Sequence, residues 1–316
     1  MAHGMSTESY ELLAPAKINL YLEVLGRRDN GYHDIRSVLV PISLYDRITV
    51  EKTSGPIKTT IETTGAIDPE QLHLARAGDN LATKAAVVLK RETGCSNGAQ
   101  IHMEKNIPVG GGLGGGSSDA AVVLKALNKL WNTGLSLEKL KEIGAQLGCD
   151  VPALVQGGAV CMEGLGEKVT PIPVANGNGG WWLAVVNPGF GVSTRDVYSR
   201  YRSSLTCGES AFNNIKFALK DGNLDGAAKC LFNSLEETVF RKYPLIEILA
   251  EALKKAGSTG VLLCGSGSSV FGLARDKQHA QGIVDHVQKE FGSSVWSAIV
   301  RTLPDGVMAA HGPLEA

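Results

Sequence analysis

The sequence lacks several features that would assign it quickly to a class of protein. Its 316 residues include six cysteines, which lie far apart and form no C-x-x-C pair, so neither a structural zinc site nor a disulfide framework is expected. The formal net charge of -1 gives no basis for a nucleic-acid-binding or anionic-membrane-binding surface. No apolar run reaches the roughly 18 residues that span a bilayer. These absences favour an intracellular protein with free thiols.

The first nine residues also lack the apolar segment of a signal peptide, because Met1–Ser9 is short and polar. We expect Met5 to be the natural first residue and Met1–Gly4 to derive from expression of the protein. The expected location is the cytoplasm, or the plastid stroma if the source is a plant whose transit peptide has been removed. With 43% hydrophobic residues, the chain can bury a sizeable core.

Glycine is abundant, with 38 residues, and it is concentrated in two places, Gly110–Gly116 and Gly265–Gly267. Glycine allows the backbone to approach a ligand closely and to adopt positive φ angles. Two such clusters in a chain that can pack a core indicate two places where the backbone lies close to a ligand or to another segment of the chain.

The hydrophobic pattern predicts strands mixed with helices in both halves, which is typical of an α+β fold. Asn80 and Gly94 have the positions of the first and last residues around a helix, and Pro41 is expected at a bulge or an edge. The strongest boundary signal is the turn-forming run at 176–180. The expected strands are 12–25, 37–51, 99–107, 159–173, 181–186, 261–264, 269–274 and 295–302. The expected helices are 81–91, 117–131, 136–148, 194–201, 212–219, 224–231, 245–256 and 278–291.

The first glycine cluster lies between a predicted strand and a predicted helix. Free backbone N–H groups at the start of a helix, together with the helix dipole, make a binding site for phosphate. Ser117 and Ser118 add hydroxyl donors at the same place. The alternative without a binding function is a flexible linker. A Walker A loop is excluded because no lysine occurs between Pro108 and Lys125.

A dinucleotide-binding loop is the other alternative for this cluster. Gly110, Gly112 and Gly115 satisfy G-x-G-x-x-G, but within a run of glycines the match is weak. That motif also needs an acidic residue at the end of a second strand, whereas Glu138 falls inside a predicted helix. The glycine cluster is therefore better explained as a phosphate-binding loop.

Two ionisable residues are candidates for the chemistry of phosphoryl transfer, which needs charge neutralisation and a group to receive the hydroxyl proton. Asp150 follows the helix stop at Gly148 and precedes Pro152, so we expect it in a fixed turn. Lys17 lies within an apolar strand, where it either extends along the surface or reaches into a site. From the residues alone, a structural role remains open for both.

Three motifs in order resemble those of the GHMP kinase superfamily. They are the N-terminal segment 14–20 (APAKINL), the phosphate loop 108–118 (PVGGGLGGGSS) and the C-terminal glycine motif 265–269 (GSGSS). Two further segments, 26–33 (GRRDNGYH) and 147–152 (LGCDVP), are similar to the branch of the family that phosphorylates a cytidine-diphosphate-linked alcohol for isoprenoid precursors. This resemblance covers about residues 13–300.

The resemblance implies a two-lobed α+β fold. It predicts a ribosomal-S5-domain-2-like, ATP-binding lobe at 1–175 and a ferredoxin-like lobe at 176–316, with the site between them. It also implies an ATP-dependent kinase that acts on the 2-hydroxyl of its substrate. The expected partner is a small molecule with a cytidine diphosphate group, with no nucleic acid or membrane, and the expected state is a monomer or a weak homodimer.

The resemblance also assigns roles to residues. Asp150 becomes the expected general base and Lys17 its charge partner. The residues expected to bind ATP are Pro108, Gly110, Gly111, Gly112, Leu113, Gly114, Gly115, Gly116, Ser117, Ser118, Asn80 and Lys105. The residues expected to bind the substrate are Asn19, Tyr32, His33, Thr194, Tyr198, Gly265, Ser266 and Gly267.

Magnesium is expected together with ATP, but no carboxylate cluster in the sequence identifies its ligands, to which Ser118 or Asp150 could contribute. Two other functions remain open. Another kinase of the superfamily would keep the glycine loops but have no use for Tyr32 and His33. A nucleotide-binding regulator without catalysis would have no need for both Lys17 and Asp150.

Overall fold

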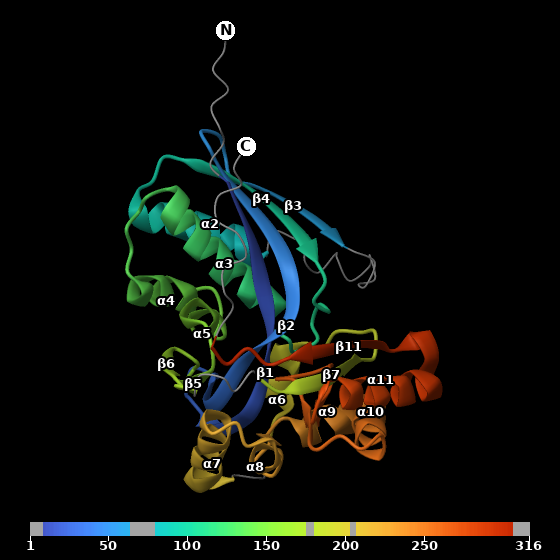
Figure 1. The fold of residues 1–316 in the computed structure, drawn as a ribbon. Helices are drawn as coiled ribbons and strands as arrows, with labels where there is room; N and C mark the ends of the chain where they lie inside the picture. Colours follow the sequence, from blue (N-terminus) through green and yellow to red (C-terminus); the bar gives the residue numbers. More distant parts are fainter. Residues whose placement is uncertain (1–8, 64–79, 175–179, 203–206, 306–316) are drawn as a thin grey trace.

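The computed structural model describes residues 9–63, 80–174, 180–202 and 207–305. Within these ranges the larger sheet has seven strands, in the order β3-β4-β2-β1-β8, with β5 pairing with β2 and β6 with β5. Two long antiparallel strands, β1 and β2, form its centre and run from the upper lobe down into the lower one (Figure 1). Its strands are β1 (Ser9–Arg27), β2 (His33–Thr53), β3 (Lys58–Thr63), β4 (Gly98–Lys105), β5 (Val160–Gly164), β6 (Lys168–Pro171) and β8 (Phe232–Asn233).

Helices α2 and α3 cover one face of this sheet (Figure 1). Helix α2 starts where the sequence predicts, because the Asn80 side chain accepts hydrogen bonds from the N–H groups of Ala82 and Thr83. The core under α2 and α3 contains fully buried Leu89 and Leu124. The helices of this lobe are α2 (Leu81–Thr93), α3 (Gly115–Leu130), α4 (Leu137–Ala145) and α5 (Val151–Gln156).

The smaller sheet is antiparallel and has the order β11-β7-β10-β9. In chain order, helices lie between β7 and β9 and between β10 and β11. This is the β-α-β-β-α-β arrangement of a ferredoxin-like lobe, as expected. Its strands are β7 (Trp182–Asn187), β9 (Val261–Leu263), β10 (Val270–Ala274) and β11 (Trp296–Arg301). The helices of this half are α6 (Thr194–Arg200), α7 (Gly208–Lys220), α8 (Leu224–Ala228), α9 (Glu236–Lys242), α10 (Pro244–Lys255) and α11 (Lys277–Phe291).

The two halves of the chain interleave. Strand β8 comes from the C-terminal half but pairs in parallel with β1 at Tyr21 and Phe232. After β11 the chain returns to the larger sheet, where Thr302 forms a bridge with Ile42 and the Leu303 N–H donates to the Pro41 carbonyl at 2.7 Å. Most of the predicted boundary at 176–180 lies outside the described residues, so the division at 175 and 176 stays a prediction.

Several predicted elements need correction. Strand β3, helix α5, strand β8 and helix α9 were not predicted. Helix α5 was missed because Pro152 stands in its first turn, where proline is tolerated although it suggests a break. Strand β8 has only two residues, too few for any alternation. Helix α3 begins at Gly115, two residues before the prediction, and α4 ends at Ala145 instead of continuing to Gly148. Pro41 lies beside a register irregularity of β1 and β2, as predicted for a bulge.

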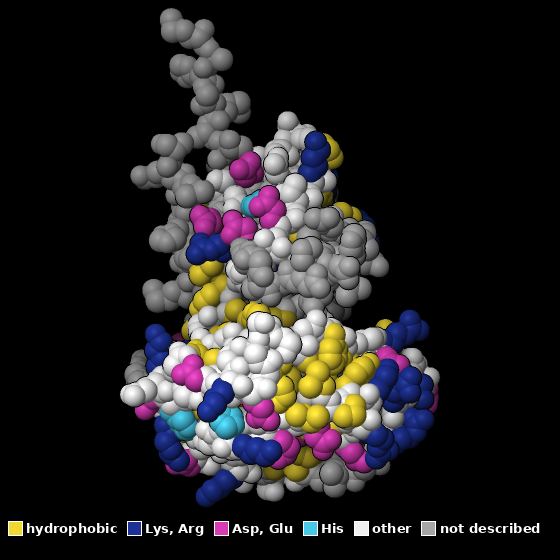
Figure 2. Space-filling model, turned by 90° about the vertical axis from the view of Figure 1, so that its right-hand side faces the viewer, with side chains coloured by type: hydrophobic (Ala, Val, Ile, Leu, Met, Phe, Trp, Pro, Cys, Tyr) yellow, Lys and Arg dark blue, Asp and Glu magenta, His cyan; other side chains and the backbone are white. Residues whose placement is uncertain are grey.

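The surface carries both signs of charge. On the face shown in Figure 2, Lys and Arg side chains are interspersed with Asp and Glu over the lower lobe, around a group of hydrophobic side chains. Among the residues that the structure describes, no helix combines the length and the apolar character that crossing a membrane requires.

Candidate active site

A cavity of about 1080 Å³ lies where the glycine loop meets segments of both halves of the chain. One side is formed by strand β1 and the loop 108–117, and the other by helix α6 and Gly265–Ser266. A volume of this size suits a ligand as large as a nucleotide together with a second molecule.

The glycine loop leads into a helix start that no side chain caps. Gly114 is the N-cap of α3, with a φ of 70°, and the first bond of the helix runs from the Ser118 N–H to the Gly114 carbonyl. The N–H groups of the first turn therefore have no acceptor within the helix. Helices α2 and α4, by contrast, are capped by the side chains of Asn80 and Ser136. The start of α3 is thus free to receive an anion, as the sequence predicts.

The C-terminal half of the chain holds the glycine loop through backbone hydrogen bonds. The Gly110 carbonyl accepts from the Val192 N–H at 2.9 Å, and the Gly111 carbonyl accepts from the Ser269 N–H at 3.0 Å. These contacts come from the C-terminal half, and they fix the loop against the second glycine cluster. The loop is therefore an ordered part of the structure and not a flexible linker.

Two glycines of the loop leave no room for a side chain. A Cβ atom on Gly112 would lie 1.9 Å from the Cys264 carbonyl oxygen. A Cβ on Gly114 would lie 2.8 Å from Cγ and 2.9 Å from Cε of Lys17. Both residues also have positive φ angles, which favour glycine. The loop thus packs directly on the Lys17 side chain.

Lys17 and Asp150 form an ion pair in the cavity. The Lys17 Nζ lies 3.2 Å from the Asp150 Oδ2 and donates to the Asn19 Oδ1 at 2.9 Å. The Lys17 side chain is 5% exposed, whereas the Asp150 side chain is 29% exposed. The Asp150 carboxylate therefore remains accessible to a ligand, and the structure brings together the two residues that the sequence singled out.

The local structure explains why these two residues meet. The pairing of β1 with β2 is irregular between Pro15 and Lys17 and again between Asn19 and Tyr21, so β1 is bent where it passes the glycine loop. Asp150 occupies the N-cap position of α5, but its side chain makes no capping hydrogen bond. Its carboxylate is turned to Lys17 instead. Asp150 lies in a turn, as expected, and this turn leads directly into α5.

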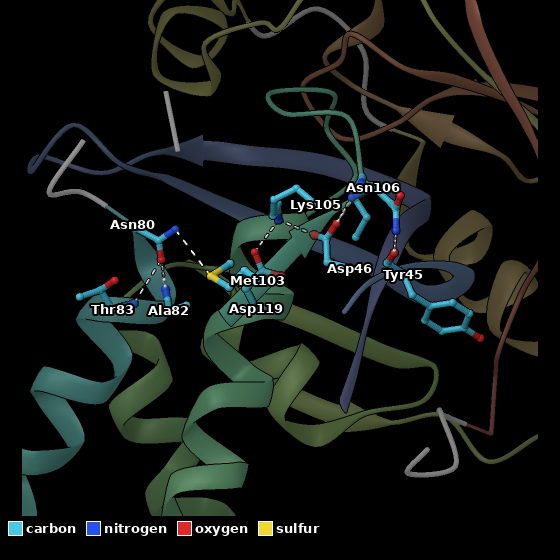
Figure 3. Close-up of polar contacts among 10 residues, drawn as sticks. Tyr45, Asp46, Asn80, Ala82, Thr83, Met103, Lys105, Asn106 and Asp119 are labelled. Carbon is cyan, nitrogen blue, oxygen red and sulfur yellow. Dashed lines mark hydrogen bonds and ion pairs between the residues drawn. The ribbon is translucent and has the colours of Figure 1, made fainter. Parts of the chain in front are cut away.

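Lys105 is buried between two carboxylates (Figure 3). Its Nζ pairs with Asp46 and lies 2.5 Å from the Asp119 Oδ2. Burial raises the pKa of Asp119 to about 7, against the opposing effect of the Lys105 charge. Burial lowers the pKa of Lys105, but the Asp119 and Asp46 charges outweigh it and the net shift is upward.

Asp46 also joins this group to the glycine loop. Its Oδ1 accepts from the backbone N–H groups of Asn106, at 2.6 Å, and Ile107, at 2.9 Å, and the Asn106 amide donates to the Tyr45 carbonyl (Figure 3). The other oxygen of Asp119 has no hydrogen-bond partner among the described residues. Lys105 lines the cavity, but its ammonium group is already committed to Asp46 and Asp119.

Asn80 also borders the cavity. Its Oδ1 is used in capping α2, and its Nδ2 lies 3.9 Å from the Met103 sulfur. The residue predicted to lie near adenine is therefore also the residue that starts α2.

Tyr32, His33 and Tyr198 line the cavity and form an aromatic corner. The His33 ring lies 5.4 Å from the Tyr198 ring and 6.1 Å from the Tyr201 ring. Burial, and then the Arg27 charge, lowers the pKa of His33, so its ring is neutral at neutral pH. Burial, and then the Asp150 charge, raises the pKa of Tyr198, so its hydroxyl keeps its proton. Tyr32 lies 61% exposed at the rim.

The second glycine cluster is joined to α6. The hydroxyls of Thr194 and Ser266 lie 2.8 Å apart, and a Cβ on Gly265 would lie 3.2 Å from the Lys17 Nζ. Gly267 points elsewhere, because its Cβ position faces Leu263 and Val239 in the core. This cluster therefore meets the cavity through Gly265 and Ser266.

Most of the predicted site residues line the cavity. The exceptions are Ser118, which is 1% exposed and whose hydroxyl has no described partner, and Gly267. Sequence reasoning missed Asp46 and Asp119, which lie 59 and 14 positions from Lys105 along the chain and form no local motif with it. Asp119 stands directly after the two serines, and that position was the one signal available. Further cavity residues that were not predicted include Arg27, Ile35, Cys149, Leu165, Arg195 and Ser199.

No metal cluster marks the cavity. Among the described residues, no three His, Cys, Asp or Glu side chains come together as a possible metal site.

Comparisons with known proteins agree with this geometry. Residues 80–158 match the family model described as GHMP kinases N terminal domain, and residues 216–293 match GHMP kinases C terminal. A 4-diphosphocytidyl-2-C-methyl-D-erythritol kinase of Symbiobacterium thermophilum is 38% identical over 294 residues, which cover 93% of this chain and 99% of that protein. The enzyme of the same name from Pelotomaculum thermopropionicum is 39% identical over 275 residues, covering 86% and 91% of the two chains.

Solved structures show the same similarity. A crystal structure of 4-(cytidine 5'-diphospho)-2C-methyl-D-erythritol kinase superposes with a TM-score of 0.69 at 34% identity, covering 92% of this chain and 99% of that one. Homoserine kinase from Cytophaga hutchinsonii superposes with a TM-score of 0.70 at 17% identity, covering 99% of each chain. The second match concerns the fold alone.

Proposed function

Because the chain belongs to the GHMP kinase superfamily and, within it, to the 4-diphosphocytidyl-2-C-methyl-D-erythritol kinases, we propose that it transfers the γ-phosphoryl group of ATP to the 2-hydroxyl of that cytidyl substrate. The products are ADP and the 2-phosphate, a step in isoprenoid precursor biosynthesis. The observation that supports this role best is the Lys17–Asp150 ion pair beside the uncapped start of α3.

The phosphates of ATP bind at the glycine loop. The free N–H groups at the start of α3 donate to phosphate oxygens, and the helix dipole stabilises their negative charge. The loop residues Pro108 and Gly110–Ser117 supply this contact, and Asn80 and Lys105 border the part of the cavity that remains for the nucleoside. Ser118 follows this loop and is buried.

The chemistry takes place at Asp150. Its carboxylate accepts the proton of the substrate 2-hydroxyl while the hydroxyl oxygen forms its bond to the γ-phosphorus and the bond to the β-phosphate oxygen breaks. Lys17 holds the carboxylate and offers positive charge to the phosphoryl group. Asn19, whose side-chain oxygen accepts from the Lys17 ammonium, is the proposed contact for the erythritol end of the substrate.

The aromatic corner receives the cytosine. Tyr32 and Tyr198 provide ring faces, and neutral His33 can hydrogen-bond to the edge of the base. Thr194, Gly265 and Ser266 line the same cavity and are the proposed contacts for the rest of the substrate. Gly267 acts indirectly, by shaping the turn that presents Gly265.

Magnesium accompanies ATP in this proposal. One or two protein oxygens suffice beside the phosphates and water. The buried Ser118 hydroxyl at the start of α3, which has no hydrogen-bond partner among the described residues, is the candidate. Asp150 is less suited, because Lys17 already occupies one of its oxygens. When bound, the metal neutralises charge on the triphosphate.

The remaining proposals concern the cellular setting. The protein works in the cytoplasm, or in the plastid stroma if its source is a plant, as a monomer or a weak homodimer without nucleic-acid or membrane partners. Its ATP-binding domain comprises residues 1–175 and its second domain residues 176–316. The family matches at 80–158 and 216–293 lie on either side of this division.

A coupled assay of ADP release tests the function. The acceptors are 4-diphosphocytidyl-2-C-methyl-D-erythritol, mevalonate, homoserine and galactose, with each acceptor tested at the same concentration. We expect ADP release with the cytidyl substrate and only background release with the other three. Equal or faster release with another acceptor would assign the protein to a different branch of the superfamily.

A further inference from the structure

Ser37 lies behind the proposed catalytic residues, where no motif points to it. It is fully buried on strand β2 and pairs with Leu22 of β1. Its hydroxyl donates to the Tyr21 carbonyl at 2.7 Å and accepts from the Asn19 Nδ2 at 2.8 Å. It is therefore the next member of a chain of hydrogen bonds that runs from the ion pair into the sheet.

The direction of this chain is fixed by chemistry. A carbonyl oxygen only accepts, so the single proton of the Ser37 hydroxyl goes to Tyr21. The hydroxyl can then only accept from Asn19, which must present its NH₂ group. The Asn19 oxygen is left to face the Lys17 ammonium, with which it forms the 2.9 Å bond.

The opposite orientation of the Asn19 amide would have the same shape but the wrong chemistry. It would point two N–H donors at the Lys17 ammonium, which has donors only. Asn19 is 4% exposed, so water cannot readily compensate for a lost partner. Lys17 favours the productive orientation from one side, and Ser37 favours it from the other by giving the Asn19 NH₂ group its acceptor.

We propose that Ser37 is a positioning residue, which fixes the Asn19 amide so that its oxygen holds the Lys17 ammonium against Asp150. This inference rests on the proposed roles of Lys17 and Asp150. The register irregularity of β1 between Asn19 and Tyr21 brings the three groups within reach, since it lets one serine serve both residues. Two of the three Lys17 hydrogens are thereby directed to Asn19 and Asp150, and the third remains for a ligand in the cavity.

The first test is Ser37→Ala, compared with Ser43→Ala as a matched control. Ser43 lies on the same strand and also hydrogen-bonds to backbone, since its hydroxyl accepts from the Arg301 N–H at 2.8 Å, but it does not contact Asn19. We expect Ser37→Ala to lower kcat about tenfold with the KM for ATP unchanged, because a hydrogen bond is lost and a buried donor is left without a partner. Ser43→Ala should keep the wild-type kcat.

A double-variant cycle separates positioning from general structure. If Ser37 acts through Asn19, then adding Ser37→Ala to Asn19→Ala should change kcat by less than about twofold. A full tenfold further loss would overturn the proposal, as would wild-type kcat in Ser37→Ala or an equal loss in Ser43→Ala. If Ser37→Ala does not fold, Ser37→Cys replaces it throughout, since the thiol has similar size but is a weak donor and acceptor.

The same measurements distinguish this proposal from the proposed function. If the wild-type protein does not phosphorylate the cytidyl substrate, or if Asp150→Asn leaves kcat unchanged, the proposed function fails. If both behave as proposed but the Ser37 and Asn19 effects add, only the role of Ser37 fails.

Discussion

Lys17 and Lys105 lie on strands of the same sheet, line the same cavity and are each 4% exposed, yet their surroundings differ. Lys17 pairs with the partly exposed Asp150 and a neutral amide. Lys105 pairs with two carboxylates, Asp46 and Asp119, whose side chains are 0% and 2% exposed. One ion pair is open to a ligand, and the other is closed off from it.

The difference shows that burial of the partner carboxylate decides whether a lysine has a structural or a catalytic role. A carboxylate that faces a cavity can exchange its partner for substrate or a proton. A carboxylate that is fully buried beside an ammonium group cannot do so without leaving a charge unpaired, which costs several kcal/mol. Lys17 and Asp150 are therefore suited to react, and the Lys105 group is suited to hold the glycine loop through Asp46.

The largest expected effect is on the open pair. Asp150→Asn keeps the shape but removes the base, so kcat should fall about 10²- to 10⁴-fold while the affinity for ATP stays close to wild type. Steady-state kinetics and ATP titration measure the two quantities. Activity above a tenth of wild type would remove Asp150 from the chemistry. Lys17→Ala should act similarly, and the double variant should lose less than the product of both effects.

Changes to the buried group of Lys105, Asp46 and Asp119 should lower the stability of the protein instead of its activity. Lys105→Met leaves two buried carboxylates without a counter-charge, so the free energy of unfolding should fall by about 3–5 kcal/mol. Lys17→Met is the matched comparison, and it should lower stability less because water can reach Asp150. Urea unfolding of the two variants gives the result. Equal losses of stability would contradict the distinction between the open and the closed pair.

The glycine loop joins the two lysines, and Gly114→Ala tests that connection. The new Cβ would press on Lys17 and require alanine at a φ of 70°, so the ATP dissociation constant should rise at least about tenfold and kcat should also fall. Gly116→Ala is the control, since its Cβ would meet only Leu81, at 3.8 Å. Calorimetric titration of folded variants checks this. Normal ATP binding by Gly114→Ala would show that the loop is not the phosphate site.

Substitutions in the aromatic corner should weaken binding of the acceptor substrate and leave ATP binding unchanged. Tyr32→Ala and Tyr198→Ala each remove a ring that can stack on the base. Stacking contributes about 1–3 kcal/mol per base, so the KM for the cytidyl substrate should rise about 5- to 150-fold. The KM for ATP should not change. If both KM values rise equally, the corner does not bind cytosine.

A pH dependence of stability is also expected from Asp119. Its pKa in the folded state, about 7, lies above its unfolded value, so its stabilising contribution is present below the unfolded pKa and is lost as the pH rises through about 7. Between about pH 4 and 7 the unfolding free energy of wild type should therefore fall more steeply with pH than that of Asp119→Asn. Parallel curves would show that Asp119 does not titrate in this window.

Local signals in the sequence were enough to find the glycine loop and the helix caps. The N-cap at Asn80 and the C-cap at Gly94 were predicted because both depend on neighbouring residues only. The loop was recognisable because glycines between a strand and a helix have few other uses. The resemblance to a family then supplied Lys17 and Asp150, for which the residues alone left a structural role open.

Long-range contacts could not be predicted. Ser37, Asp46 and Asp119 gain their roles from strand register and burial, which no local pattern encodes. Strand β8 was missed because two residues are too few to show an alternating hydrophobic pattern. Its place also depends on pairing with β1, which lies about 200 positions earlier in the chain. The residues that hold a site in place are harder to find than those that touch its ligand.

The position of the transferred phosphate tests the central claim most directly. Wild-type protein, ATP, Mg²⁺ and 4-diphosphocytidyl-2-C-methyl-D-erythritol are incubated together, and the product is examined by ³¹P and ¹³C nuclear magnetic resonance beside a reaction with Asp150→Asn. We predict a new phosphomonoester whose phosphorus couples to the carbon at position 2, formed by wild type and absent with the variant over the same time. A phosphate on another hydroxyl, or equal product from Asp150→Asn, would contradict the account.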